Sequence, residues 1–312
     1  MAARRQGLQA APQHGVALVL VLWIALALTL IGAVMASSLQ REARATGDIL
    51  QAAQARQAAR AGISRGLVQL RNLESGDVRQ LALAGTAGEW QGFALGDLEV
   101  RYRFFGEAGR LDINRADRDL IQGLLLATGV PTNRLDTLTD NLLDWRDPSP
   151  ETRLHGTSPG AYSGLGLSEG RRDGEFESVE ELQQVAGYSP EIYRRLARHL
   201  TVHTNARRPD PEFASVMVLA AHPGASMDVA ETWARDRQEI TRAGAGALPS
   251  FPFGGARGGL SSVFGIEAVA SDGQGTRAHI EAVFDIRQGE RLPVTLLEWR
   301  EPPIWQPAPG AS

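Results

Sequence analysis

The N-terminal part of the chain carries a long apolar stretch that runs into an amphipathic one. Residues 16–40 contain no charged side chain, and about 20 apolar residues in a helix span the hydrocarbon core of a bilayer. Beyond that stretch, one face recurs at steps of three and four residues: Ile49, Ala53, Arg56, Arg60, Ile63, Leu67 and Leu70. The pattern predicts a single helix over about 16–70, apolar all round in its first half and with one apolar stripe in its second.

Alternation of apolar and polar residues predicts strands on both sides of a central region. In "LEVRYRFFGE" (98–107) the apolar residues occupy every second position, which is typical of a half-buried strand. Near the C-terminus, "SSVFGIEAVA" and "TRAHIEAVFDI" flank the glycine-rich "SDGQG" and predict a hairpin, and "PVTLLEWR" predicts a further strand.

The central region has helical periodicity instead, and its pattern repeats. "LDINRADRDLIQGLLLATGVPTNRLDTLTDNLLDW" predicts a helix, a glycine turn and a second helix, and "FESVEELQQVAGYSPEIYRRLARHL" predicts the same order. The second copy opens with Ser178 and Glu181 at the spacing of a capping box, and "DPEFASVMVLAAHPGASMDVAETWARDRQEI" is a third, weaker copy. These units resemble SAM-like and helix-hairpin-helix modules. The predicted fold class is therefore α+β: a long N-terminal helix and a small antiparallel sheet, with a large helical insertion.

Composition and charge exclude several kinds of functional site. The 312 residues carry a formal net charge of -4 and no cysteine, which excludes disulfides, thiolate metal sites and cysteine nucleophiles. The helix-hairpin-helix resemblance raises DNA binding, but the predicted turns "ATGVP", "VAGYS" and "AHPGA" have one glycine each and few basic neighbours. Phosphate binding needs a positive surface, so we expect no nucleic-acid partner.

The residues before the apolar stretch set its orientation. Arg4 and Arg5 precede it and no acidic residue does, so the positive-inside rule places the N-terminus in the cytoplasm and the bulk of the chain outside. A secretory signal peptide, cleaved near Ala36 and Ser38, is the alternative. Such a peptide has an apolar core of about 7–15 residues, whereas here the apolar run and the helical period continue past that length.

Gly15 lies directly before the apolar run, in "QHGVALVLVLW", and this junction resembles the precursors of type IV pilins and pseudopilins. The resemblance implies that a prepilin peptidase cuts after Gly15 and leaves Val16 as the methylated N-terminus. That class usually has glutamate at the fifth mature position, where this chain has Leu20. Leu20, together with "LDINRAD", "LLDWRD" and "FESVEELQQVAGYSPEIYRRLARHLTV", is similar to the K family of minor pseudopilins of type II secretion systems.

The resemblance implies a non-enzymatic assembly protein at the tip of the type II secretion pseudopilus, needed for protein export across the outer membrane. It implies one crossing of the inner membrane, a periplasmic bulk, and assembly with minor pseudopilins I and J. Helix packing is expected through small or apolar residues: Ala25, Ala27, Gly32, Ala33, Ile49, Ile63, Leu67 and Leu70. The alternative is a single-pass membrane-anchored periplasmic scaffold or ligand-binding module that is never processed as a prepilin.

The expected organisation follows from these elements and from the resemblance. We expect a leader at 1–15, a transmembrane and amphipathic pilin helix at 16–72, and the first part of a pilin sheet at 73–110. Two helical segments follow, a SAM-like domain at 111–203 and a SAM-like hairpin at 204–245. A glycine- and proline-rich connection at 246–260 then leads to the last strands and the tail at 261–312.

One stretch matches a hydrolase motif in its letters but not in its chemistry. "GTSPG" (156–160) has the G-x-S-x-G spacing of a nucleophile elbow. That elbow uses the backbone N–H of the residue after the serine in its oxyanion hole. Here that residue is Pro159, which has no N–H. We therefore expect a loop and no enzyme.

An acidic cluster near the end of a predicted helix is a candidate for binding calcium. Asp140, Asp144 and Asp147 fall on one helix face, with Glu151 beyond. Carboxylates at a helix C-terminus oppose the helix dipole and repel each other, and Ca²⁺ takes six to eight oxygen ligands. The resembled family carries calcium after the matching "DW", although "GTS" here replaces a frequent "GAE". A site here would be structural; the alternative is a solvated acidic turn.

Overall fold

The structure, a computed structural model, describes residues 14–71, 73, 75–149, 151–164, 172–244, 247–254, 262–286 and 294–301. Within these ranges, the side chains of 14–17, 32–34, 36–46, 71, 75, 76 and 163 lie outside the description. The chain divides into two compact units, residues 1–54 and residues 55–312. The second unit contains the sheet and all of the shorter helices.

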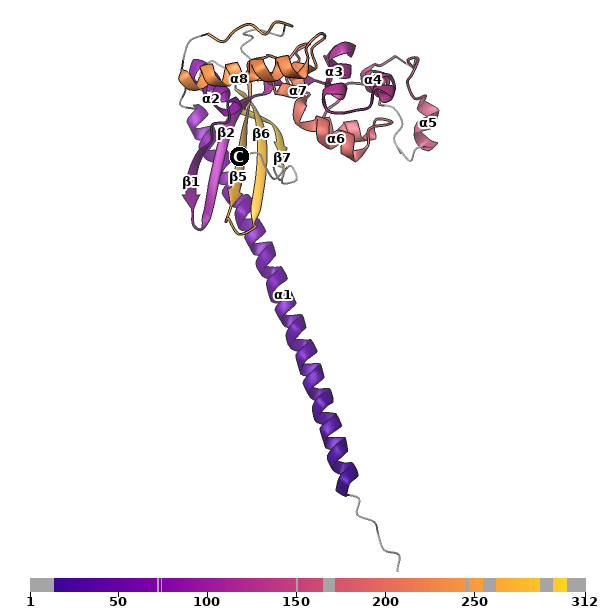
Figure 1. Ribbon diagram of the computed structural model, residues 1–312, viewed down its shortest axis with the longest axis vertical. Helices are drawn as coiled ribbons and strands as arrows, with labels where there is room; N and C mark the ends of the chain where they lie inside the picture. Colours follow the sequence, from indigo (N-terminus) through magenta and orange to yellow (C-terminus); the bar gives the residue numbers. More distant parts are fainter. Residues whose placement is uncertain are drawn as a thin grey trace, which may run out of the picture. The chain divides into compact units, whose positions relative to one another are not determined.

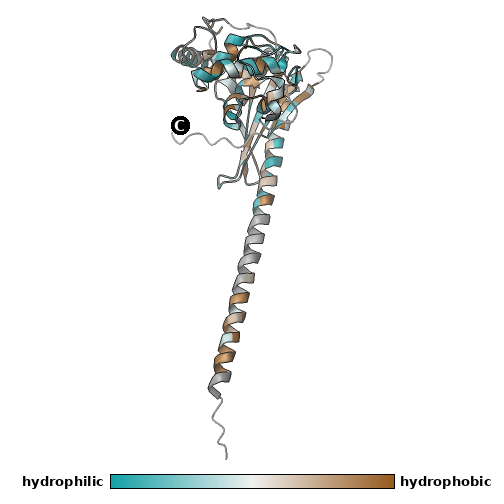
Figure 2. Ribbon diagram, turned by 90° about the vertical axis from the view of Figure 1, so that its right-hand side faces the viewer, coloured by the Kyte–Doolittle hydropathy of each residue, from teal (hydrophilic) through white to brown (hydrophobic). Residues whose placement is uncertain are grey.

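The first helix, α1 (His14–Arg71), has 58 residues (Figure 1). Its bounds confirm the single long helix predicted from the apolar stretch and the amphipathic period after it. In the first unit the described large apolar side chains of α1 are exposed, and Figure 2 shows hydrophobic residues along this part of the helix. Across the residues that the structure describes, no helix combines the length and the apolar content needed to cross a membrane.

The second unit is built on a five-stranded antiparallel sheet in the order β1-β2-β5-β6-β7 (Figure 1). Its strands are β1 (Gln91–Leu95), β2 (Leu98–Gly106), β5 (Val263–Ser271), β6 (Arg277–Ile286) and β7 (Val294–Arg300). Ser271 pairs with Arg277 across the turn between β5 and β6, which confirms the predicted hairpin. Because β2 pairs with β5, the strands before and after the helical region form one sheet.

The second half of α1 packs on one face of this sheet. Ala55, Ala59 and Ile63 share a buried core with the alternate apolar residues of β2, β5 and β6. Small residues allow a close approach: a Cβ added at Gly66 would lie 3.1 Å from Ile266. Of the stripe predicted for the amphipathic half of the helix, Ile63, Leu67 and Leu70 cover the sheet. Arg56 and Arg60 of that prediction are exposed, and Ala55 and Ala59 take the buried positions in their place.

Helix α2 (Ser75–Thr86) lies in the segment 73–110, which the sequence analysis assigned to the sheet alone. Val78 belongs to the core that α1 forms with the sheet. Ala82 and Leu83 join a smaller core with Ala108 and Phe213. The prediction missed this helix because its apolar residues span only 78–84, about two turns, which is too short a stretch to show a clear helical period.

The helical region lies between β2 and β5. Its elements are η1 (Glu107–Gly109), β3 (Leu111–Asp112), α3 (Arg118–Ala127), α4 (Thr132–Arg146), α5 (Pro159–Gly164), η2 (Val179–Gln184), α6 (Pro190–Leu196), η3 (Ala197–His199), β4 (Leu200–Thr201), α7 (Val216–Ala220) and α8 (Met227–Ala243). The short strands β3 and β4 pair in parallel, Leu111 with Leu200, and bring the two ends of the first two repeats together.

Three glycine turns organise this region, as the repeat predicted. Gly129 lies between α3 and α4, Gly187 between η2 and α6, and Gly224 between α7 and α8, with φ angles of 83°, 87° and 84°. Only glycine adopts such angles without strain. The predicted capping box is also present at the start of η2. The side chain of Ser178 accepts from the backbone N–H of Glu181, and the side chain of Glu181 accepts from the backbone N–H of Ser178.

Candidate functional site

The residues predicted for processing lie in the first turn of α1. Gly15 and Val16 are helical in backbone, their side chains fall outside the description, and the leader 1–13 lies outside the described residues. The cleavage after Gly15 therefore stays a prediction. Leu20, at the position where the resembled class keeps glutamate, is 59% exposed.

The residues predicted for helix packing fall into two groups. Ile63 and Leu70 are buried against the sheet and Leu67 packs on the same core, so these three serve the chain's own fold. Ile49 is 72% exposed within the first unit. Ala25 and Ala27 are also exposed, whereas the side chains of Gly32 and Ala33 fall outside the description. The sequence analysis missed Val68, which is exposed on the second half of α1.

A row of charged residues crosses the other face of the sheet. Arg103 of β2 pairs in register with Glu267 of β5, Glu267 with Glu281 of β6, and Glu281 with Arg300 of β7. Arg103 contacts Glu267 at 2.6 Å. Burial raises the pKa of Glu267, but the hydrogen bond from His279 and the charge of Arg103 outweigh it and set this pKa at about 2.

This charged row also joins the sheet to the helical region. Arg110, after β2, contacts Glu281 at 2.5 Å and Glu107 at 3.4 Å. His203, after β4, contacts Glu298 of β7 at 3.1 Å. Sequence reasoning treated the polar positions of the strands as solvent-facing and missed these contacts, since the partners lie far apart in the chain.

The stretches that resemble the K family lie against one another in the helical region. Asn114 of "LDINRAD" exchanges two hydrogen bonds with the backbone of Phe176, at 2.9 and 2.8 Å. Arg146 of "LLDWRD" donates to the carbonyls of Ile113 and Ala116, at 2.6 and 2.8 Å. The ring of Trp145 stacks on Phe176. These residues therefore hold the two helical repeats together.

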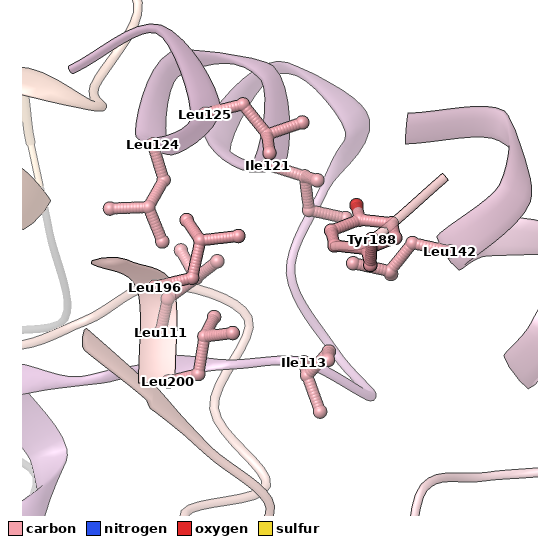
Figure 3. Close-up of a pocket in the computed structure, with 9 residues that line it drawn as sticks. All are labelled: Leu111, Ile113, Ile121, Leu124, Leu125, Leu142, Tyr188, Leu196 and Leu200. Atoms are coloured by element: carbon pink, nitrogen blue, oxygen red, sulfur yellow. The ribbon is translucent and has the colours of Figure 1, made fainter. Parts of the chain in front are cut away.

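A small cavity lies inside the helical region, and its lining excludes a polar ligand. Figure 3 shows its side chains: Leu111, Ile113, Ile121, Leu124, Leu125, Leu142, Tyr188, Leu196 and Leu200. The hydroxyl of Tyr188 donates to the carbonyl of Leu138 at 3.0 Å. Burial raises the pKa of Tyr188 well above its usual range, so this hydroxyl stays protonated. The cavity is a packing feature of the core.

The predicted acidic cluster lies at the end of α4 and binds a loop of the chain. Asp140 and Asp144 are buried, Asp147 is half-buried and Glu151 is exposed. Asp140 pairs with the guanidinium of Arg118. Arg153 donates to both of the other aspartates, to Asp144 at 2.6 Å and to Asp147 at 3.0 Å.

This arrangement does not fit the expected calcium ion. The oxygens of Asp140 and Asp144 accept from guanidinium groups and backbone N–H groups, whose positive ends repel a metal ion. Within the described part of the chain, no three Asp, Glu or His side chains lie together so as to hold a metal. The stretch 156–160 is a loop that enters α5, and Thr157 donates its N–H to Asn141 at 2.6 Å.

A known family matches the first part of the helical region. Residues 100–205 match the family described as type II secretion system, protein K. This segment belongs to the protein K family. It runs from β2 through β4 and contains the first two helical repeats with the three contacting stretches above. The family expected from the sequence is thereby confirmed over the protein K segment.

Among solved structures, the chain is similar to one from the crystal structure of the GspK-GspI-GspJ complex of the enterotoxigenic Escherichia coli type 2 secretion system. The two share 12% identity with a TM-score of 0.48, over 77% of this chain and 99% of that chain. A likeness this weak transfers no property by itself. No curated protein matches the chain.

Proposed function

We propose that the chain is the minor pseudopilin K of a type II secretion system and acts in protein export across the outer membrane. The match of residues 100–205 to protein K carries this proposal. The long helix α1 packed on an antiparallel sheet is the architecture that the pseudopilin resemblance implies. The chain would act by assembly, with its helical insertion forming a SAM-like module, and not by catalysis.

The first half of α1 would anchor the chain in the inner membrane. Its described side chains over 18–31 are exposed and apolar, and exposing such a surface to water is unfavourable by roughly 25 cal/mol per Å². Arg4 and Arg5 precede it, so the N-terminus would lie in the cytoplasm and the second unit in the periplasm. Cleavage after Gly15 by a prepilin peptidase would keep the whole helix.

A position at the tip of the pseudopilus accounts for Leu20. A carboxylate in hydrocarbon is costly unless it is paired, and the resembled class uses the glutamate at this position to neutralise the N-terminal amine of a neighbouring subunit. A subunit with no neighbour ahead of it gains nothing from that glutamate. The proposed partners are minor pseudopilins I and J. Their helices would pack against the first half of α1.

Deletion of the gene in its own host tests the proposal. We expect the substrates of type II secretion to disappear from the culture medium and to accumulate in the periplasm. A plasmid copy of the wild-type chain should restore export, and Gly15→Leu, which blocks the proposed cleavage, should not. Unchanged export after deletion, or full rescue by Gly15→Leu, would support the alternative of an unprocessed periplasmic scaffold or ligand-binding module.

A further inference from the structure

The loop after α4 is held by alternate backbone groups. The N–H groups of Arg153, His155 and Thr157 donate to Asp144, Asp140 and Asn141, at 3.1, 3.0 and 2.6 Å. The segment contains a turn, in which the N–H of Gly156 donates to the carbonyl of Arg153 at 2.9 Å. The acceptors Asp140 and Asn141 lie four and three residues before Asp144 on α4, so the three share one side of the helix. The loop 152–157, called the pinned loop below, is thus bound to α4 along its length.

Each of the two buried aspartates of this site has a cationic partner within the chain. The carboxylates of Asp140 and Asp144 are 2% and 1% exposed, and a buried carboxylate without a cationic partner is strongly destabilising. Arg118 supplies one positive charge to Asp140. Arg153 supplies the other, and its two terminal nitrogens bridge Asp144 and Asp147. A planar guanidinium is suited to hold two acceptors at once.

Gly156 closes the remaining space around Asp144. A Cβ at this position would collide with Oδ2 of Asp144 and lie 2.9 Å from the side chain of Thr152. A side-chain ligand at position 156 is therefore incompatible with the observed loop.

We propose that Arg153 is the built-in cation of the pinned loop, so that this helical region is ordered without calcium. The guanidinium does what a hard cation would do between Asp144 and Asp147: it cancels their repulsion and fixes the loop on α4. This inference is independent of the proposed role in secretion, because it concerns only the stability and ion binding of the purified chain.

Thermal unfolding of the full chain in detergent, with millimolar CaCl₂ or with EDTA, tests this inference. We expect the Tm of the wild type to be the same in both conditions. Arg153→Gln leaves two carboxylates facing each other, so we expect its Tm in EDTA to fall by roughly 3 to 8 °C and calcium to recover part of the loss. Arg195→Gln is the matched control, since Arg195 forms an exposed pair with Glu191 on α6, and it should show no calcium response.

Isothermal titration of the wild type with CaCl₂ supplies a readout that needs no variant. We expect no saturable binding. Saturable binding, or a calcium-dependent rise in the Tm of the wild type, would overturn the inference, because it would mean that calcium displaces Arg153. An Arg153→Gln chain as stable as the wild type would also overturn it. If Arg153→Gln does not fold, Arg153→Lys keeps the charge and should retain a calcium-independent Tm.

Discussion

Gly62 of α1 lies directly against Val100 of β2. A Cβ added at Gly62 would be 2.9 Å from Cγ1 of Val100 and 3.0 Å from Cβ of Ala268. Helix and sheet therefore approach each other as closely as a residue without a side chain permits. We expect Gly62→Leu to destabilise the chain by about 1–3 kcal/mol, since overpacking forces the helix away from the sheet. Denaturant unfolding followed by circular dichroism measures this.

The control for that substitution lies on the same helix. No atom lies within 4 Å of the Cβ position of Gly47, and leucine favours a helix over glycine by roughly 0.5–1 kcal/mol. Gly47→Leu should thus leave stability unchanged or slightly raised. Equal losses for the two variants would contradict the close packing at Gly62.

The contact between Arg110 and Glu281 should stabilise the junction of sheet and helical region. Both side chains are largely buried, and removal of Arg110 leaves Glu281 with the longer contact to Arg300, at 4.0 Å. We expect Arg110→Leu to cost about 3 kcal/mol in the free energy of unfolding. The pair Arg101–Glu99 is exposed and 4.0 Å apart on the same sheet, so Arg101→Leu should change stability by no more than about 0.5 kcal/mol. A loss at Arg110 as small as that would argue against the junction.

Stability should fall on mild acidification because of a buried histidine. Burial lowers the pKa of His222 to about 4, with Arg208 adding to the effect, whereas an unfolded histidine has a pKa near 6.5. The unfolded state therefore binds more protons between these values, and the free energy of unfolding decreases as pH falls through this window. Denaturant titrations at pH 7 and pH 4.5 measure the difference.

His222→Phe separates this effect from that of other groups. The ring of His222 packs edge-on against Phe251, so phenylalanine should keep the packing and remove part of the pH dependence between 6.5 and 4. Glu267, whose pKa is about 2, starts to lose its contribution below about pH 5. Burial also lowers the pKa of His199 to about 3, and both contributions remain in His222→Phe. An unchanged slope in His222→Phe would contradict the account.

Because the chain has no cysteine, single cysteines can map the packing of α1. Ile49→Cys places a thiol at an exposed position of the helix, and Ala59→Cys places one in the buried core against the sheet. In membranes that contain the proposed partners, minor pseudopilins I and J, we expect cross-links to a partner from position 49 only. Cross-linking from position 59, or from neither, would contradict the assignment of position 49 to a partner contact and of position 59 to the core against the sheet.

Much of this fold was predictable from local periodicity, but the pairing of residues that lie far apart in the chain was not. The helix α1, the β5–β6 hairpin and the three glycine turns each follow from residues within one stretch of sequence. The row from Arg103 to Arg300 was not predictable, because the same alternation fits polar residues facing solvent or facing a second layer. Helix α2 was missed for lack of a long apolar period.

The acidic residues of the candidate site were predictable from the sequence, whereas the arginine that contacts them was not. The spacing of Asp140, Asp144 and Asp147 indicated one face of a helix, and α4 carries all but the last of them, with Asp147 following its end. The neutralising Arg153 lies in a loop whose path no periodicity fixes. A sequence reading therefore finds the negative charges and overlooks their partner.

The mature N-terminus of the membrane-bound chain tests the central proposal most directly. Mass spectrometry of the chain from cells with and without a prepilin peptidase would locate it. A pseudopilin predicts a peptidase-dependent start at Val16, with the whole of the helix retained. An intact start at Met1 or Ala2 under both conditions would contradict that account in favour of a plain membrane anchor, and a start near Ser37 would mean a cleaved and exported protein.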